Sequence, residues 1–133
     1  METKKLTAKD LMVGDWVYST FSDKPCKVQA IELSEHGYGS VRLNGVDGVK
    51  DIISVSPIPL TAEILSKNNF EKHYDDDIII YTHPQGIIIE MGINYKLFDD
   101  GHFYVRGIQY RLYFVHQLQQ ALRLLNTDKE IVL

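Results

Sequence analysis

The stretch over residues 110–125 has the clearest helical period of the sequence. It reads Tyr-Arg-Leu-Tyr-Phe-Val-His-Gln-Leu-Gln-Gln-Ala-Leu-Arg-Leu-Leu, and an α-helix turns by about 100° per residue. The pattern predicts an amphipathic helix from about residue 113, and the other apolar segments are expected to pack against its apolar face. At this angle the apolar arc holds Phe114, Val115, Leu118, Ala121, Leu122 and Leu125, and the opposite, polar arc holds His116, Gln119, Gln120 and Arg123.

The chain before residue 58 has the pattern of short strands separated by turn formers. Asn44-Gly45 predicts a two-residue hairpin, because both positions tolerate a positive φ. Short strands at this spacing predict a small SH3-like β-barrel, closed or half-closed, over residues 1–58. Strands are expected at Trp16-Val-Tyr18, over 27–33, over 40–43 and at Ile52-Ile-Ser-Val55.

Pro57-Ile-Pro-Leu-Thr61 separates this part from the rest, because two prolines exclude a helix or a central strand. Thr61 is well placed to N-cap a short helix over 62–67. Asn68-Asn69 is expected to end that helix, since asparagine accepts a left-handed conformation. The joint carries large apolar residues, so 1–58 and 59–133 are expected to pack as one compact unit.

The second part predicts an antiparallel β-meander with readable turns. His83-Pro84-Gln85-Gly86 has the residue preferences of a type I turn. With all four residues in the loop, Thr82 pairs with Ile87, Ile80 with Ile89, and Ile78 with Met91.

The next strand is expected to run through Ile93, Tyr95 and Leu97. A three-residue loop at Asp99-Asp100-Gly101 then pairs Leu97 with Phe103 and Tyr95 with Val105, which keeps large apolar residues on one face. The predicted fold is therefore α+β: an SH3-like barrel, a short helix, an antiparallel meander, and a C-terminal helix packed on the sheet.

The composition is that of an ordinary globular protein, with 44% hydrophobic and 24% charged residues. A formal net charge of −4 gives no broad positive field, which argues against nucleic acid and an anionic membrane as partners. The single cysteine, Cys26, cannot form an internal disulfide, and no apolar run reaches transmembrane length. A cytoplasmic location is expected.

The polar ribbon, defined as His116, Gln119, Gln120 and Arg123, is the candidate binding site. Spacings of three, four and seven residues place these side chains on one helix surface. A solvated outer face gives the same pattern. His116 lies about 160° from Leu118 in the helix phase, so its ring is expected to be exposed. One histidine with two amides and an arginine is not a catalytic set, and no catalytic residue is predicted.

Two other segments carry side chains that could do chemistry. His73-Tyr-Asp-Asp-Asp77 combines ligand types that suit a divalent cation, but adjacent residues of a strand rarely converge on one ion. An acidic turn or edge-strand guard is expected there, with no metal or other cofactor. Aromatic and basic residues that could contact nucleic acid interleave at Tyr104, Arg106, Tyr110, Arg111 and Tyr113, although tyrosines at a sheet edge give the same pattern.

Three motifs in this order are similar to those of a known family: Leu11-Met-Val-Gly-Asp-Trp-Val17, then Pro57-Ile-Pro-Leu-Thr-Ala-Glu-Ile-Leu65 with Asn69-Phe70-Glu71, and finally Val115-His-Gln-Leu-Gln119 before Ala121-Leu122. The chain resembles a family of small uncharacterised proteins common in gut Bacteroidetes and their mobile elements. That resemblance implies a bacterial cytoplasm and no established activity. It directs attention to His116 and Gln119, which lie in the recurrent C-terminal motif.

The sequence thus predicts a non-enzymatic interaction or binding module with a protein partner. The alternative is a nucleic-acid-associated protein of a mobile element, which would use the barrel or the tyrosine–arginine segment. An enzyme of unknown class ranks third, because no catalytic constellation is assembled in the sequence.

Overall fold

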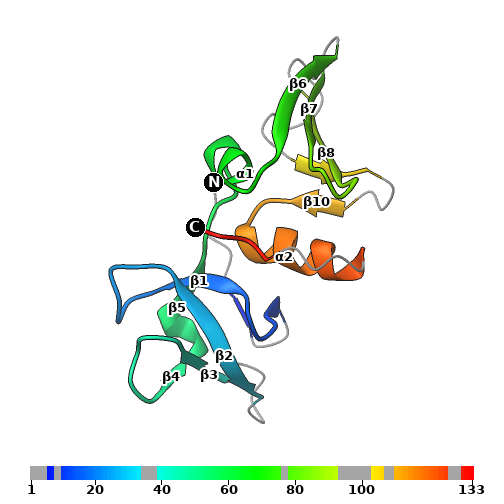
Figure 1. Ribbon diagram of the computed structural model, residues 1–133. Coiled ribbons are helices and arrows are strands. Elements are labelled where there is room, and N and C mark those ends of the chain that lie inside the picture. The colour runs from blue at the N-terminus through cyan, green and yellow to red at the C-terminus, as the bar shows by residue number, and fades with distance from the viewer. Residues whose placement is uncertain are drawn as a thin grey trace. The chain divides into compact units, whose positions relative to one another are not determined.

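The computed structural model describes residues 6–7, 10–33, 39–75, 78–92, 103–106, 110–125 and 130–133. The chain divides into two compact units, Met1–Ile58 and Pro59–Leu133. The described residues form two antiparallel five-stranded sheets and two α-helices (Figure 1). The predicted α+β class is confirmed.

The first unit is built on one sheet, in which the strands lie in the order β4-β3-β2-β1-β5. A register shift between Val28 and Ala30 marks an irregularity in β2. Within the described residues no ladder joins β4 to β5, so a closed barrel is not seen. The elements are β1 (Trp16–Ser19), β2 (Cys26–Glu32), β3 (Ser40–Leu43), β4 (Val49–Asp51), the 3₁₀ helix η2 (Ile52–Ser54) and β5 (Val55–Pro57).

Strand alternation explains the core of this unit. Val17 lies opposite Cys26, and Val28 lies opposite Leu43, and all four are buried. Successive side chains of a strand point to opposite faces, so their neighbours along β1 turn outward. Asp15 is also fully buried, and its carboxylate accepts a hydrogen bond from the Met12 amide at 2.8 Å, which fixes the turn before β1.

Two predictions about the end of this sheet are wrong in detail. The Asn44-Gly45 turn forms, with Gly45 at φ 84°, but Asn44 does not adopt a positive φ and pairing resumes only at Val49. The connection is therefore longer than a two-residue hairpin. The first three residues of the predicted strand 52–55 form η2 instead, because the Asp51 carboxylate accepts a hydrogen bond from the Ile53 amide at 3.1 Å and caps the turn.

The second unit begins with the predicted short helix, α1 (Ala62–Lys67). The Thr61 hydroxyl accepts a hydrogen bond from the Ile64 amide at 3.3 Å, and Asn69 adopts φ 69° just after the helix. Both predicted ends are confirmed. The sheet follows, in the order β10-β9-β8-β7-β6. Its strands are β6 (Glu71–Asp75), β7 (Ile78–Thr82), β8 (Ile88–Gly92), β9 (Phe103–Val105) and β10 (Tyr110–Leu112).

The register between β7 and β8 differs from the prediction by one residue. Thr82 pairs with Ile88, not Ile87, and the loop is Pro84-Gln85-Gly86. The Gly86 amide donates to the His83 carbonyl at 2.9 Å, as in the predicted turn, but Gly86 at φ 87° shortens the loop to three residues. As a result Ile79 and Tyr81 face the core, and Ile78 and Ile80 face outward.

The predicted partners of β9 are also wrong. Phe103 pairs with Met91 and Val105 pairs with Ile89. The predicted partners Tyr95 and Leu97, and the predicted loop at 99–101, lie outside the described residues. The broader prediction holds, because Phe103 and Val105 are buried on the same face as Ile89.

The amphipathic helix is α2 (Val115–Leu124), which lies beside β10 (Figure 1). Its apolar arc is fully buried at Val115, Leu118, Ala121 and Leu122. The Gln117 side chain accepts hydrogen bonds from the Tyr113 and Phe114 amides at 2.7 and 3.1 Å, which satisfies donors at the helix start.

Candidate functional site

The polar ribbon of α2 is not an exposed surface. His116 and Gln119 are each only 1% exposed, and Gln120 and Arg123 are half-buried. The expectation that the His116 ring faces solvent is therefore wrong. The ring stacks on Phe114, with centroids 5.8 Å apart and planes 8° apart.

Gln119 holds the last described segment of the chain. Its side-chain oxygen accepts a hydrogen bond from the Ile131 amide at 2.8 Å, and Ile131 is buried. Asn68, at the end of α1, pairs with Val132 in both directions: it donates to the carbonyl at 2.8 Å and accepts from the amide at 2.7 Å. The buried side-chain amides of Gln119 and Asn68 thus bind the backbone of Ile131 and Val132 within the same unit. The structure therefore gives Gln119 a structural role.

The segment that begins at His73 lies on β6, and all of its described residues are exposed. The His73 ring nitrogen Nε2 lies 3.2 Å from the Thr82 hydroxyl on the neighbouring strand. Asp76 and Asp77 of this prediction lie outside the described residues. Among the residues that the structure describes, no three His, Cys, Asp or Glu side chains gather as metal ligands would.

The tyrosine–arginine segment is only partly described. Arg106 is about half exposed and forms an ion pair with Glu90, in which its Nε donates to Oε1 at 2.8 Å. The side chains of Tyr110 and Arg111 lie outside the description. Because this ion pair holds Arg106 to Glu90 of β8, Arg106 is less available to a phosphate.

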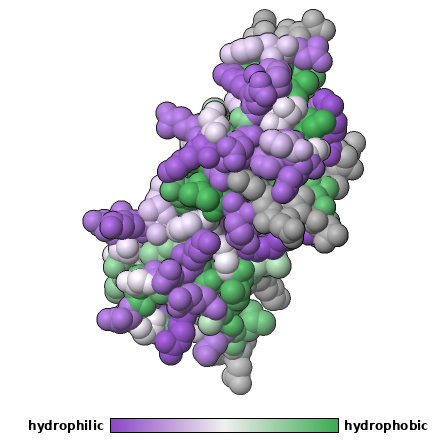
Figure 2. Space-filling model, viewed as in Figure 1, coloured by the Kyte–Doolittle hydropathy of each residue, from purple (hydrophilic) through white to green (hydrophobic). Residues whose placement is uncertain are grey.

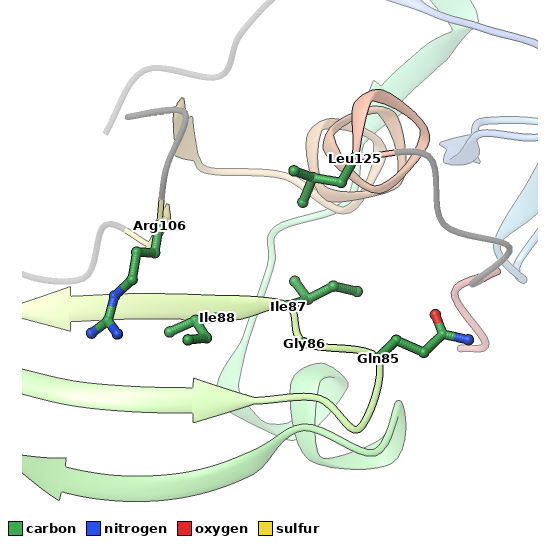
Figure 3. A pocket seen from close by; sticks show the side chains of 6 residues that line it. All are labelled: Gln85, Gly86, Ile87, Ile88, Arg106 and Leu125. Carbon is green, nitrogen blue, oxygen red and sulfur yellow. The ribbon is translucent and has the colours of Figure 1, made fainter.

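A pocket of about 320 Å³ opens in the second unit. It is formed by the β7–β8 turn, the residue after β9 and the end of α2, from Gln85, Gly86, Ile87, Ile88, Arg106 and Leu125. Figure 3 shows Leu125 facing Ile87 across it, with Arg106 and Gln85 at opposite ends. The volume lies at the low end for ligand pockets. The described residues of the lining offer no acid–base pair, since the one ionisable group among them is the ion-paired Arg106.

The first unit carries a surface that the sequence patterns did not indicate. Phe21 follows β1 and is 57% exposed, and Ile53 on η2 is 76% exposed. The Thr20 amide donates to the Ser54 carbonyl at 3.0 Å, so the residue before Phe21 is bonded to the residue after Ile53. The Lys50 ammonium lies 4.3 Å from the Phe21 ring centroid. We call Phe21, Lys50 and Ile53 the apolar corner.

A second aromatic group lies on the outer face of β1 and β2. Trp16 pairs with Lys27, whose ammonium lies 5.2 Å from the indole ring centroid, and Tyr18 on the same face of β1 is 43% exposed. Figure 2 shows hydrophobic residues, in green, on the surface of this unit in the lower part of the view. Strand alternation is the sequence signal for this group, because Trp16 and Tyr18 point to the opposite face from the buried Val17.

Comparison with known proteins adds no assignment: no protein-family model, curated protein or solved structure matches the chain. In the described part of the chain, neither helix has the length and apolar character needed to cross a bilayer.

Proposed function

We propose that the protein is a non-enzymatic interaction module, and that its first unit binds a protein partner. One observation carries the proposal: of the ten large hydrophobic residues found exposed among the described residues, seven belong to Met1–Ile58. Exposed apolar groups gathered in one unit are typical of an interaction surface, whereas isolated ones are ordinary.

We further propose that this unit is a half-closed, SH3-like barrel. The outermost strands of the sheet, β4 and β5, are joined by only the three residues of η2. In a flat sheet with neighbours about 4.8 Å apart, these strands would be separated by roughly 19 Å. A connection from Asp51 to Val55 spans at most about 14 Å when extended, and about 8 Å as a 3₁₀ helix. The sheet must therefore curl, which supports the proposal.

The curl gives the apolar corner its position. Lys50 lies on β4 at one end of the sheet, and Phe21 follows β1 next to the other end. The contact between them links residues from near the two ends of the sheet, whose outermost strands share no ladder among the described residues. A partner would cover Phe21 and Ile53, and the lysine beside the ring would favour a carboxylate or carbonyl of that partner.

The alternative is a nucleic-acid-associated protein, because Trp16 and Phe21 each have a lysine over the ring and could stack on bases. Acidic and basic residues are nearly balanced in 1–58, which gives no electrostatic footprint for phosphates. The protein partner is therefore preferred. We also propose the bacterial cytoplasm that the family resemblance implies. We propose too that the two units pack as one body.

An affinity purification from native cell extract tests the function. The bait is the full chain, either unchanged or carrying Phe21→Ser with Ile53→Ser. The matched control carries Leu124→Ser with Val132→Ser, which removes two similarly exposed apolar residues of the second unit. Melting curves first establish that all three are folded. We expect a specific co-purifying protein that the corner variant loses and the control keeps. Equal recovery with all three baits would overturn the proposal.

A further inference from the structure

Strand β6 forms one edge of the second sheet. Among the described residues, β7 is the only strand that pairs with it, through all five positions from Glu71 to Asp75. All five side chains of β6 are exposed. Figure 1 shows the β6–β7 hairpin extending beyond α2. The outer edge of β6 therefore offers backbone N–H and C=O groups to an added strand.

The register assigns a different chemistry to each face of this edge. Lys72 pairs with Tyr81 and Tyr74 pairs with Ile79, so both lie on the face that buries Tyr81 and Ile79. Tyr74 is nevertheless 71% exposed, with the Lys72 ammonium 5.2 Å from its ring centroid. The core-side face of the sheet is therefore uncovered at β6, and an apolar side chain beside Tyr74 would bury part of its ring.

The other face carries the acidic residues. Glu71, His73 and Asp75 alternate along it, and in the sequence Asp76 and Asp77 follow directly. Basic residues at every second position of an added strand would lie on this face, where Glu71 and Asp75 attract them, since cross-strand pairs of opposite charge are favourable.

We propose that β6 is a docking edge for an extended basic peptide, a segment of a partner protein in which Lys or Arg alternates with apolar residues. The segment adds as a sixth strand. Backbone hydrogen bonds hold it, its basic side chains lie on the face of Glu71 and Asp75, and its apolar side chains cover Tyr74.

Charge decides between this occupant and a second copy of the chain. Two β6 strands paired antiparallel about His73 would place Glu71 of each copy opposite Asp75 of the other. Like charges directly opposite are destabilising. A basic peptide reverses the sign of the same interaction.

The test is fluorescence anisotropy with a labelled peptide, Lys-Val-Arg-Val-Lys between Gly-Ser flanks, and the full-length protein. One control peptide has the same composition with its three basic residues consecutive. A second carries N-methyl groups on its three central residues, which keeps the charge and removes the hydrogen bonds. The protein variant is Glu71→Lys with Asp75→Lys, and its control is Glu63→Lys, an exposed charge reversal on α1 of the same unit.

We expect saturable binding of the alternating peptide, weakened at least about tenfold by the β6 variant through like-charge repulsion. Glu63→Lys should change it less than about twofold, in line with screening of distant charges. Both control peptides should bind at least about tenfold more weakly, since β-addition depends on main-chain bonds. Amide exchange should slow at 71–75 on binding. Equal binding of all three peptides would overturn the proposal, and so would protection of 71–75 in the protein alone through self-association.

Discussion

Asn68 gives the sharpest test of how the second unit is held together. Its side chain is 1% exposed and makes three hydrogen bonds: it donates to the Ile64 and Val132 carbonyls, each at 2.8 Å, and accepts from the Val132 amide at 2.7 Å. A typical hydrogen bond contributes about 1 kcal/mol net, and a buried group left unsatisfied costs about 1–3 kcal/mol. Val132 is 56% exposed, so water can replace part of what is lost. We expect Asn68→Ala to lower the free energy of unfolding by about 2–3 kcal/mol.

Denaturant melts measure this loss, and amide hydrogen exchange at Ile131 and Val132 locates it. The control is Ser66→Ala, an exposed residue of the same helix, which should stay within about 0.5 kcal/mol of the wild type. Exchange at Val132 should accelerate in Asn68→Ala and not in the control. A loss no larger than that of Ser66→Ala, with unchanged exchange at Val132, would refute the reasoning.

Three further results are expected. The Tyr81 hydroxyl is buried with no hydrogen-bond partner among the described residues, so Tyr81→Phe should leave stability at neutral pH unchanged or raise it by up to about 1 kcal/mol. Burial raises the pKa of Tyr81, so the folded state disfavours ionisation of its hydroxyl. The free energy of unfolding is therefore unaffected by this group below the ordinary tyrosine pKa of 10.0 and falls as the pH rises further. Unfolding of wild type and Tyr81→Phe, followed from about pH 8 to 11, should show a steeper decline in the wild type. His116→Ala should cost about 1–3 kcal/mol in a denaturant melt because the ring is buried on Phe114, and a change under about 0.5 kcal/mol would contradict a packing role for the ring. Mixed DNA and RNA oligomers should show only weak, salt-sensitive anisotropy changes, and saturable binding at about micromolar concentration and physiological salt would favour the nucleic-acid alternative.

Local patterns in the sequence predicted the elements well. The α2 helix follows from its period, α1 from Thr61 and the two asparagines, and β3 was predicted with its observed bounds. In each case the signal lies within a few residues of the element itself. The burial of Phe103 and Val105 on one face likewise needed only strand alternation.

The β7–β8 register could not be obtained in the same way. Residues 78–80 and 87–89 are each three isoleucines, so the apolar pattern fits either register. The hydrogen bond from Gly86 to His83 is also common to both loops. Only the left-handed Gly86, which leaves His83 to pair with Ile87, separates them.

The candidate site was misjudged for a different reason. Helical periodicity treats a polar side chain as a solvated one, but Gln119 is buried because its amide oxygen accepts from Ile131, twelve residues away. The apolar corner was missed because the residues next to Phe21 and Ile53 are joined by the Thr20–Ser54 hydrogen bond, which spans more than thirty positions of the sequence. Both features depend on contacts between distant residues, which no local pattern encodes.

Photo-crosslinking from the apolar corner tests the central claim most directly. Benzoylphenylalanine replaces Phe21 in the full chain, and in the control it replaces Leu124, which is 73% exposed in the second unit. After irradiation in native cells, adducts are identified by mass spectrometry. We predict one dominant protein adduct from position 21 that is absent from position 124. The same adducts from both positions, or none from position 21, would contradict the claim that the first unit binds a protein partner.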